Sequence, residues 1–339
     1  MPFVMAPTTT HFDPAEAWSV ASRERVVSMS MVGDAFGRPL VDELESGDYD
    51  LSGLLVLITG GAGGLGKAAG RWMVRDGATV VLMGRTRTTL AAAAAELAAE
   101  ASGDARVLTF VGDGTVASEV EAAVGAAVQG GGRLDICVTT VGGGRNAPLL
   151  VFDEKMFLDD LNRNLVSAFL AVKYSAAAMA RTGGGSIVCI SSDAAKLSWP
   201  FLISYCSAKA GLEAMVRVAA DELGHLGIRV NAVRPGLTRT ARTENGLLFR
   251  DEVLPLFLEQ KALHRTGLPD DIAAAIRYLA GPESSWVTGQ SFAIDGGHEL
   301  RRATNLEFVA RSVWGDLVVD EALAGRIPQS PEPLPNESA

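Results

Sequence analysis

Seven short runs of apolar, often β-branched residues alternate with longer alanine-rich stretches between residues 51 and 298. The runs are Leu54–Ile58, Thr79–Met83, Val107–Val111, Leu134–Thr139, Ser186–Ile190, Ile228–Val233 and Ser291–Ile294. Short apolar runs bounded by glycine or polar residues predict buried strands, and the stretches between them have helical periodicity. This alternation predicts an α/β fold with a single doubly wound parallel sheet of about seven strands and helices on both faces. Such sheets bind ligands at the carboxyl ends of the strands, where the strand order reverses.

A glycine-rich stretch from Thr59 to Gly66 follows the first predicted strand and precedes a helix expected to begin near Lys67. Its glycines are Gly60, Gly61, Gly63, Gly64 and Gly66. Glycine lets the backbone turn sharply beside a pyrophosphate, and a helix N-terminus presents free amide groups to that anion. The spacing fits two versions of the dinucleotide fingerprint. It predicts a Rossmann-type fold that binds a dinucleotide, and the alternative is a purely structural strand-to-helix turn.

The end of the second predicted strand indicates which nicotinamide cofactor is used. An acidic residue there would hydrogen-bond the ribose 2′-hydroxyl of NAD, but this chain has Gly84 followed by Arg85 and Arg87. An arginine pairs well with a 2′-phosphate, so NADP(H) is favoured over NAD(H). The alternative is that Arg85 is a solvated charge at a helix start. Asp113, after the third strand, is placed either to bind the adenine or to cap the helix beginning near Val116.

Tyr205 has a lysine, Lys209, four residues later, and it follows Ser192 by thirteen residues. None of the other three tyrosines has a lysine at that spacing. Residues four apart on a helix share a face, so the charge of Lys209 is expected to lower the pKa of the tyrosine from about 10. The set predicts a tyrosine acid/base in a nicotinamide-dependent oxidoreductase. The alternatives are a buried structural tyrosine and a strand-end serine.

With these motifs in order, residues 52–298 resemble the short-chain dehydrogenase/reductase family. Other motifs agree in order and spacing: Asn164 stands where the family has its helix asparagine, Pro235-Gly236 with Thr240 resembles the segment that holds the nicotinamide, and Arg265–Asp271 and Asp295-Gly296-Gly297 resemble the C-terminal signatures. The agreement of several independent motifs makes the resemblance specific.

The resemblance implies a catalytic set of Asn164, Ser192, Tyr205 and Lys209. Ser192 would hydrogen-bond the substrate oxygen, Lys209 the nicotinamide ribose, and Asn164 a water that connects Lys209 to solvent. The residues expected to bind the cofactor are Thr59, Gly60, Gly61, Gly64, Leu65, Gly66, Arg85, Thr86, Asp113, Gly114, Thr140, Gly142, Tyr205, Lys209, Pro235, Gly236, Thr238 and Thr240.

One motif departs from the family. After the fourth strand the family usually has Asn-Asn-Ala-Gly, whereas this chain has Thr139-Thr140-Val141-Gly142. Threonine supplies a hydroxyl where asparagine supplied an amide, so the hydrogen-bond pattern must differ. We expect cofactor binding to survive the change.

The resemblance places a substrate lid at residues 241–262. Its apolar side chains are Leu247, Leu248, Phe249, Leu254, Leu256, Phe257 and Leu258, and Trp199 and Phe201 precede Tyr205 on the substrate side. An apolar lid over an apolar wall predicts a hydrophobic alcohol or ketone as substrate. The alternative, nearly as well supported, is that these side chains pack in the core or at an oligomer contact.

Partners and compartment follow from composition and from the resemblance. The net charge of −10 and the pI near 5.0 argue against nucleic-acid binding. The apolar runs are too short to cross a bilayer, and no basic segment followed by an apolar core marks a secretory signal. Three scattered cysteines and four separated histidines favour a reduced cytoplasmic protein without a metal site. The resemblance implies a homotetramer or homodimer formed through the helices that carry Asn164 and Tyr205.

The chain is expected to have three parts. Residues 1–50 form an N-terminal extension with a helix start at Asp13, residues 51–298 the catalytic domain, and residues 299–339 a C-terminal extension whose proline-rich tail, from Pro328, is disordered.

The sequence therefore predicts an NADP(H)-dependent ketoreductase or alcohol dehydrogenase acting on a hydrophobic small molecule. One alternative is an NAD-dependent dehydrogenase of the same family. The other is a catalytically silent dinucleotide-binding protein, which the altered Thr139-Thr140 stretch and the extensions would favour.

Overall fold

The computed structural model describes residues 50–301 and 306–328 of the 339-residue chain. The helix start predicted at Asp13 and most of the proline-rich tail lie outside the described residues. No helix in the described ranges is long and apolar enough to cross a membrane.

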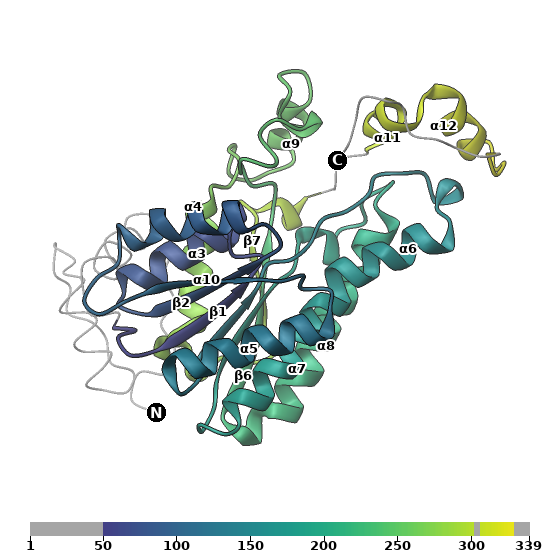
Figure 1. The fold of residues 1–339 in the computed structure, drawn as a ribbon. Coiled ribbons are helices and arrows are strands. Elements are labelled where there is room, and N and C mark those ends of the chain that lie inside the picture. Colours follow the sequence, from purple (N-terminus) through teal and green to yellow (C-terminus); the bar gives the residue numbers. More distant parts are fainter. Residues whose placement is uncertain (1–49, 302–305, 329–339) are drawn as a thin grey trace, which may run out of the picture. The chain divides into compact units, whose positions relative to one another are not determined.

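A seven-stranded sheet forms the centre of the fold (Figure 1). Its strands are β1 (Leu55–Thr59), β2 (Thr79–Gly84), β3 (Val107–Val111), β4 (Ile136–Thr139), β5 (Gly185–Ile190), β6 (Ile228–Pro235) and β7 (Ser291–Ile294). They are all parallel and lie in the order β3-β2-β1-β4-β5-β6-β7. The predicted doubly wound parallel sheet is confirmed. β3 and β7 have the predicted bounds, and the others differ by one or two residues.

Ten α-helices occur in the described residues. They are α3 (Gly64–Arg75), α4 (Arg87–Ala98), α5 (Ala117–Gly131), α6 (Glu154–Leu161), α7 (Ser167–Met179), α8 (Ile203–Leu223), α9 (Leu254–Glu259), α10 (Pro269–Ala280), α11 (Glu307–Trp314) and α12 (Asp316–Leu323). α5, α7 and α8 bury their apolar stripes against one face of the sheet, and α3, α4 and α10 cover the other face.

The central strands read as continuous apolar runs because both of their faces are buried, whereas the edge strands β3 and β7 are partly exposed. In β1, Leu55 and Leu57 face the layer of α5, α7 and α8, whereas Val56 and Ile58 face the opposite layer. Alternate side chains of a strand point to opposite faces, so a strand covered on both sides has no polar positions to spare.

The strand order reverses between β1 and β4, which lead away to β2 on one side and β5 on the other. Thr59 and Thr139, at the carboxyl ends of these two strands, are partners in the parallel register. Loops leaving adjacent strands in opposite directions create a crevice at this edge. The glycine turn follows β1, and the altered threonine stretch follows β4, so both predicted motifs lie at this position.

Candidate active site at the carboxyl ends of the central strands

The glycine turn packs too tightly for side chains. A Cβ atom at Gly60 would lie 2.6 Å from Oγ1 of Thr140, and one at Gly66 would lie 2.7 Å from the main-chain oxygen of Gly60. Gly60 also has a φ of +73°, in the left-handed region that favours glycine. The glycines are therefore required by the turn itself.

The first turn of α3 offers its amide groups to a ligand. The helix begins at Gly64, three residues before the predicted start near Lys67, and its N-cap residue, Gly63, provides no side-chain hydrogen bond to the free amides. Its own partial positive charge and uncapped amides suit an anion. A Cβ at Gly64 would lie 2.8 Å from Thr240, so the turn is closed on one side by the segment after β6. This cradle fits the pyrophosphate of a dinucleotide.

Thr140 takes over a structural role at the crevice. Its hydroxyl donates to the main-chain oxygen of Thr59 at 2.8 Å and lies 3.2 Å from that of Gly60. The departure from the family pattern thus still ties the end of β4 to the glycine turn. Thr140 donates through its hydroxyl here, where the asparagine of the family pattern would donate through its side-chain amide.

The residues expected near the adenosine lie at the ends of β2 and β3. Arg85 and Thr86 are exposed before α4, and Gly114 lies against Val141, since a Cβ there would be 3.0 Å from its side chain. The Asp113 carboxylate accepts hydrogen bonds from the amide and hydroxyl of Thr115, and the backbone bond lowers its pKa. Asp113 stabilises its own turn.

The suggestion that Asp113 caps the following helix is therefore wrong. α5 begins at Ala117, its N-cap residue is Val116, and no side chain caps it. The hydrogen bonds of Asp113 to Thr115 close the turn two residues earlier, too far from the free amides of the helix to serve them.

The predicted catalytic residues converge beside the loop that follows β4. Lys209 is 3% exposed, and its ammonium lies 5.7 Å from the ring centre of Tyr205 on the same face of α8. A Cβ at Gly142 would lie 2.9 Å from Asn164 and 3.3 Å from the Lys209 ammonium, and one at Gly144 would lie 2.9 Å from Tyr205. Glycines in this loop therefore let the backbone run directly over the catalytic set.

The expected lowering of the tyrosine pKa is not found. Burial raises the pKa of Tyr205 to about 12, a hydrogen bond with the Ser192 side chain opposes that rise, and the charge of Asp193 adds to it. Burial also lowers the pKa of Lys209 to about 8. The helical spacing places Lys209 on the same face as Tyr205, but the charge that lowers the tyrosine pKa is that of Arg242, and desolvation of the phenolate outweighs it.

Asn164 sits in a π-helical turn, η2 (Asn162–Val166), between α6 and α7. Its amide nitrogen donates to the main-chain oxygens of Gly143 at 2.7 Å and Asp160 at 2.8 Å, and its oxygen accepts from the Gly143 amide at 3.0 Å. Single π-turns inside helices recur at functional sites. Here the turn directs a fully buried amide at the loop beside Lys209.

A chain of hydrogen bonds extends behind Ser192. Its hydroxyl lies 3.1 Å from one carboxylate oxygen of Asp193, and the other oxygen lies 2.9 Å from Nδ1 of His298. His298 is completely buried and packs edge-on against Trp199. Sequence reasoning missed both Asp193 and His298. The adjacency of an acidic residue to Ser192 was the only available signal, because His298 lies 105 residues away.

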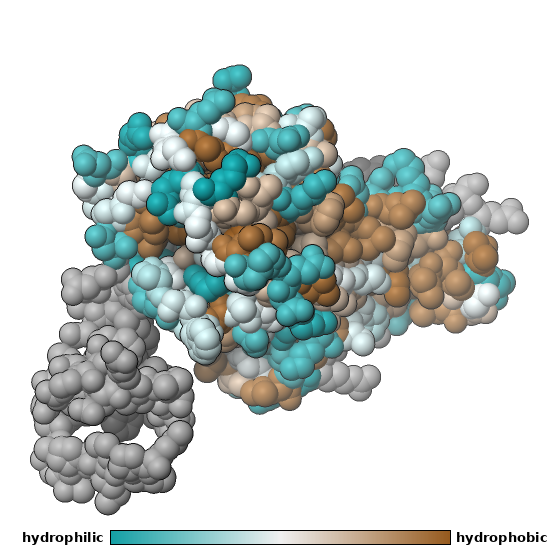
Figure 2. Space-filling view, turned by 90° about the horizontal axis from the view of Figure 1, so that it is seen from below, coloured by the Kyte–Doolittle hydropathy of each residue, from teal (hydrophilic) through white to brown (hydrophobic). Residues whose placement is uncertain are grey.

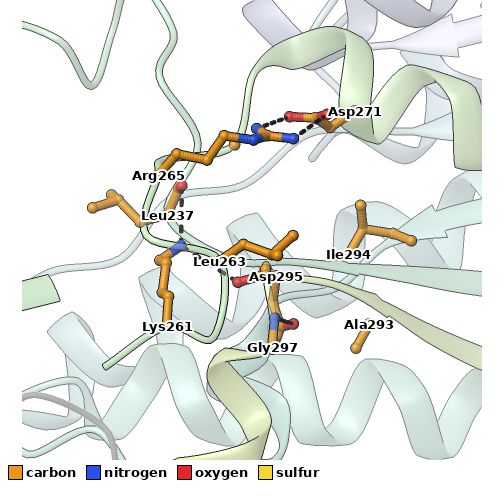
Figure 3. Close-up of a pocket in the computed structure, with 12 residues that line it drawn as sticks. Leu237, Lys261, Leu263, Arg265, Asp271, Ala293, Ile294, Asp295 and Gly297 are labelled. Atoms are coloured by element: carbon orange, nitrogen blue, oxygen red, sulfur yellow. Dashed lines mark hydrogen bonds and ion pairs between the residues drawn. The ribbon is translucent and has the colours of Figure 1, made fainter. Parts of the chain in front are cut away.

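The Pro-Gly segment after β6 is held from behind (Figure 3). A Cβ at Gly236 would lie 2.8 Å from the Cα of Asp295, and Thr238 donates to the Gly236 oxygen at 2.9 Å. Behind it a cavity of about 290 Å³ is lined by Lys261, whose buried ammonium points to the main-chain oxygens of Leu237 and Asp295 at 3.4 and 3.5 Å. These contacts join the segment to the end of β7.

The sequence left open whether the residues of the predicted lid cover the substrate or pack in the core, and in the structure some of them are buried and others exposed. Phe257 is buried and stacks on Trp199, with ring centres 5.8 Å apart, whereas Leu256 is exposed. Leu247 and Leu248 pack against the same cluster, which also contacts Tyr205. The apolar lid and the apolar wall therefore meet beside the tyrosine, and part of the lid is core.

Known proteins resemble the chain over the region that carries this site. Residues 60–299 match the sequence profile of a family described as enoyl-(acyl carrier protein) reductase. A 3-oxoacyl-(acyl carrier protein) reductase of Thermotoga maritima is 35% identical over 248 residues, covering 73% of this chain and 98% of the relative. An L-rhamnose-1-dehydrogenase of Scheffersomyces stipitis is 35% identical over 250 residues, covering 73% of this chain and 96% of the relative.

A solved structure also resembles this chain. That of a short-chain type dehydrogenase/reductase from Mycobacterium ulcerans superimposes with a TM-score of 0.76 at 32% identity, covering 80% of this chain and 98% of the other. The two named relatives act on an acyl carrier substrate and on a sugar. Their likeness to this chain therefore does not identify its substrate.

Proposed function

Because the chain belongs to the short-chain dehydrogenase/reductase family and is therefore an NAD(P)-dependent oxidoreductase, we propose that it interconverts a ketone and a secondary alcohol on a hydrophobic small molecule, with NADP(H) as cofactor. The observation that carries this proposal is the convergence of Tyr205, Ser192 and Lys209 on one side of the loop after β4.

The residues divide the chemistry among them. A bound nicotinamide dinucleotide would provide the hydride chemistry, in either direction, between the carbonyl and the alcohol. Tyr205 gives its phenolic proton to the substrate oxygen in reduction, and a pKa near 12 keeps that proton available throughout the neutral range. Ser192 steadies the charge on the same oxygen. Lys209 holds its ammonium beside the tyrosine, and Asn164 orders the loop that covers both.

The cofactor would be held along the whole crevice. The glycine turn and the start of α3 would hold the pyrophosphate, and the segment from Pro235 to Thr240, which closes on Gly64, would hold the nicotinamide. Arg85 is exposed directly after β2, and no Asp or Glu stands at the end of that strand to bind a ribose 2′-hydroxyl. This supports binding of a 2′-phosphate and hence NADP(H). An NAD-dependent enzyme remains the alternative within the family.

The hydrophobic character of the substrate rests on the cluster around Tyr205. Trp199, Phe257 and Leu237 contribute to it, and these side chains come from three separate segments. Pockets lined by aromatic and aliphatic side chains with a few polar groups favour apolar ligands.

We also infer a homodimer or homotetramer. α7 and α8 border an apolar groove of about 640 Å³, in which Phe169 is 47% and Val218 is 57% exposed. Apolar side chains gather on the face of the molecule seen in Figure 2. An apolar surface of this kind marks a protein contact.

We further propose a cytoplasmic location. All three cysteines are unpaired, which fits the reducing environment of the cytoplasm.

The test is NADPH-dependent reduction of a panel of hydrophobic ketones by the wild type and by Tyr205→Phe. Loss of a general acid is expected to slow turnover by about 1,000-fold while NADPH affinity, followed by fluorescence, changes by about twofold or less. Tyr278→Phe, on α10, is the matched control and should behave as the wild type. Comparable turnover by Tyr205→Phe would exclude the assigned role. Cofactor binding without turnover on any ketone or alcohol would favour the silent dinucleotide-binding alternative.

A further inference from the structure

The described C-terminal segment, residues 306–328, lies beyond the part of the chain that matches the family profile. It carries α11 and α12, and both helices pack on this same chain beside the segments that precede Tyr205. The buried apolar side chains of this segment are therefore covered by its own chain.

The first contact joins α11 to the lid. Leu306 and Val309 are buried in one cluster with Trp199 and Phe257, and Tyr205 packs against that cluster. The C-terminal segment thus belongs to the apolar surroundings of the predicted acid/base residue.

The second contact joins the segment to the loop after β4. Trp314 is buried beside Ala147 and Val151, and its indole nitrogen donates to the main-chain oxygen of Asn146 at 2.8 Å. Val319 of α12 is fully buried in the same cluster. A buried tryptophan combines a large apolar area with one directed hydrogen bond, so it fixes both the distance and the orientation of α11.

An arginine holds the two helices in this arrangement. Arg311 pairs with Glu307 at 2.8 Å on its own helix, and with Asp316 at 3.1 Å and Asp320 at 2.8 Å on α12. One guanidinium shared among three carboxylates forms a network, which orders side chains better than isolated surface pairs do. These ion pairs therefore hold α11 and α12 in one arrangement relative to each other.

Phe201 connects both contacts to the site. It packs against each of the two clusters, and its main-chain oxygen accepts a hydrogen bond from the Ala147 amide at 2.9 Å. Its φ is +71°, the single positive value at a residue other than glycine in the described part of the chain. Such a backbone persists only where the surroundings enforce it, and it frequently marks a functional position.

We propose, building on the function proposed above, that residues 306–323 form a fixed wall of the substrate site and limit the length of ligand that reaches Tyr205. The wall is built from α11, seated on Phe201 and anchored by Trp314. The site accordingly takes compact hydrophobic ketones and excludes long, extended alkyl chains.

Cys206 provides a test that needs neither turnover nor cofactor. It packs against the cluster that contains Leu306 and Val309, whereas Cys137 of β4 and Cys189 of β5 are completely buried between the sheet and its helices. The full chain and a chain ending at residue 305 are treated with a thiol reagent, with Cys206→Ser as the control for the labelled site. Removal of the wall is expected to speed labelling about tenfold or more. An unchanged rate would overturn the proposed packing.

Ligand length is tested with straight-chain methyl ketones whose alkyl chains run from about four to about twelve carbons, since a pocket discriminates by about tenfold or more per misfitting group. Short ketones should protect Cys206 from labelling in both chains, and long ones only in the shortened chain. Where turnover occurs, the ratio of kcat/KM for long over short ketones should rise in the same way. Equal protection by long ketones in both chains would show that the segment does not limit length.

The full-length variant Trp314→Ala repeats the test without shortening the chain, in case the shortened chain folds poorly. Trp314→Phe is the variant compared with it. The alanine should speed Cys206 labelling and admit longer ketones, while phenylalanine, which keeps an aromatic ring but loses the hydrogen bond to Asn146, should fall between the alanine variant and the wild type. If no ketone is reduced by the full chain, the proposed function fails, but labelling and protection still decide whether the wall exists.

Discussion

The ammonium of Lys209 donates a hydrogen bond of 2.7 Å to the main-chain oxygen of Ile190, the last residue of β5. This contact fixes a 3% exposed cation at the carboxyl edge of the sheet. Burial lowers the pKa of Lys209 to about 8, while Cys189 and Glu213 oppose the change. Unfolding returns the lysine to its usual pKa, so the stability of the fold must depend on pH through this residue.

Lys209→Met is expected to remove that dependence. Below pH 8 the lysine is charged in both states and the folded state bears the whole cost of burying it. As pH rises from 8 toward 10.5 the folded state loses its proton first, so this cost disappears. The free energy of unfolding of the wild type should therefore rise by about 3 kcal/mol relative to the variant over this range. Chemical denaturation at a series of pH values measures it.

The control for this measurement is Lys173→Met, which removes an exposed lysine from α7 and should leave the pH profile parallel to that of the wild type. Parallel profiles for Lys209→Met and the wild type would contradict the burial of a charged ammonium. Lys209→Met should also lose both turnover and cofactor affinity, whereas Tyr205→Phe should lose turnover alone.

Asp193→Asn is expected to make Tyr205 more acidic. The carboxylate raises the tyrosine pKa, after the larger effect of burial. Removing its charge should lower that pKa by about one unit or less. Alcohol oxidation uses the phenolate as base, so its rate rises with pH as Tyr205 loses its proton; in the variant this rise should occur at lower pH, and tyrosinate absorbance should follow. Asp221→Asn, at an exposed position of α8, should move neither. If the rise does not move, the charge of Asp193 does not control the acidity of Tyr205.

Arg85→Glu is expected to reverse the cofactor preference. The arginine is exposed at the end of β2, where its replacement by a carboxylate would repel a 2′-phosphate and accept a hydrogen bond from a ribose hydroxyl. Affinity for NADPH should fall by about tenfold or more relative to NADH, as measured by fluorescence titration. Arg181→Glu, beyond α7, makes the same charge change at an exposed position and should alter neither affinity. Tighter NADH binding by the wild type would make Arg85 a surface charge.

Local patterns predicted most of this fold and part of its site. The seven strands were identified because each is short, apolar and bounded by turns, and the glycine turn because its spacing is set by backbone geometry. The order of strands made the remaining placements predictable, since all carboxyl ends meet at one edge. Thr140 lies where an asparagine was expected, and its hydrogen bonds to Thr59 and Gly60 depend on that edge.

Effects of burial and of distant contacts were not predictable. The rule for residues four apart on a helix gave Lys209 the right face but could not weigh its desolvation against that of Tyr205. His298 meets Asp193 only because the end of β7 returns to the end of β5. The packing of α11 on the lid likewise joins segments that no local pattern relates.

The apolar surface of α7 and α8 gives the prediction on assembly. Phe169 and Val218 are both about half exposed in a groove lined mainly by alanine and other apolar side chains. Small side chains let two helices approach closely, so we expect a second copy of the chain to cover this surface. An arginine at position 218 would bury an unpaired charge in each copy.

Val218→Arg is therefore expected to weaken self-association on the order of 100-fold, because each buried unpaired charge costs several kcal/mol. Light scattering coupled to gel filtration should show the wild type as a dimer or tetramer and the variant as a monomer at the same concentration. Trp286→Arg is the control, because Trp286 is 94% exposed in the segment before β7 and outside the groove. If Trp286→Arg dissociates the assembly and Val218→Arg does not, the contact is made elsewhere and the groove between α7 and α8 faces solvent.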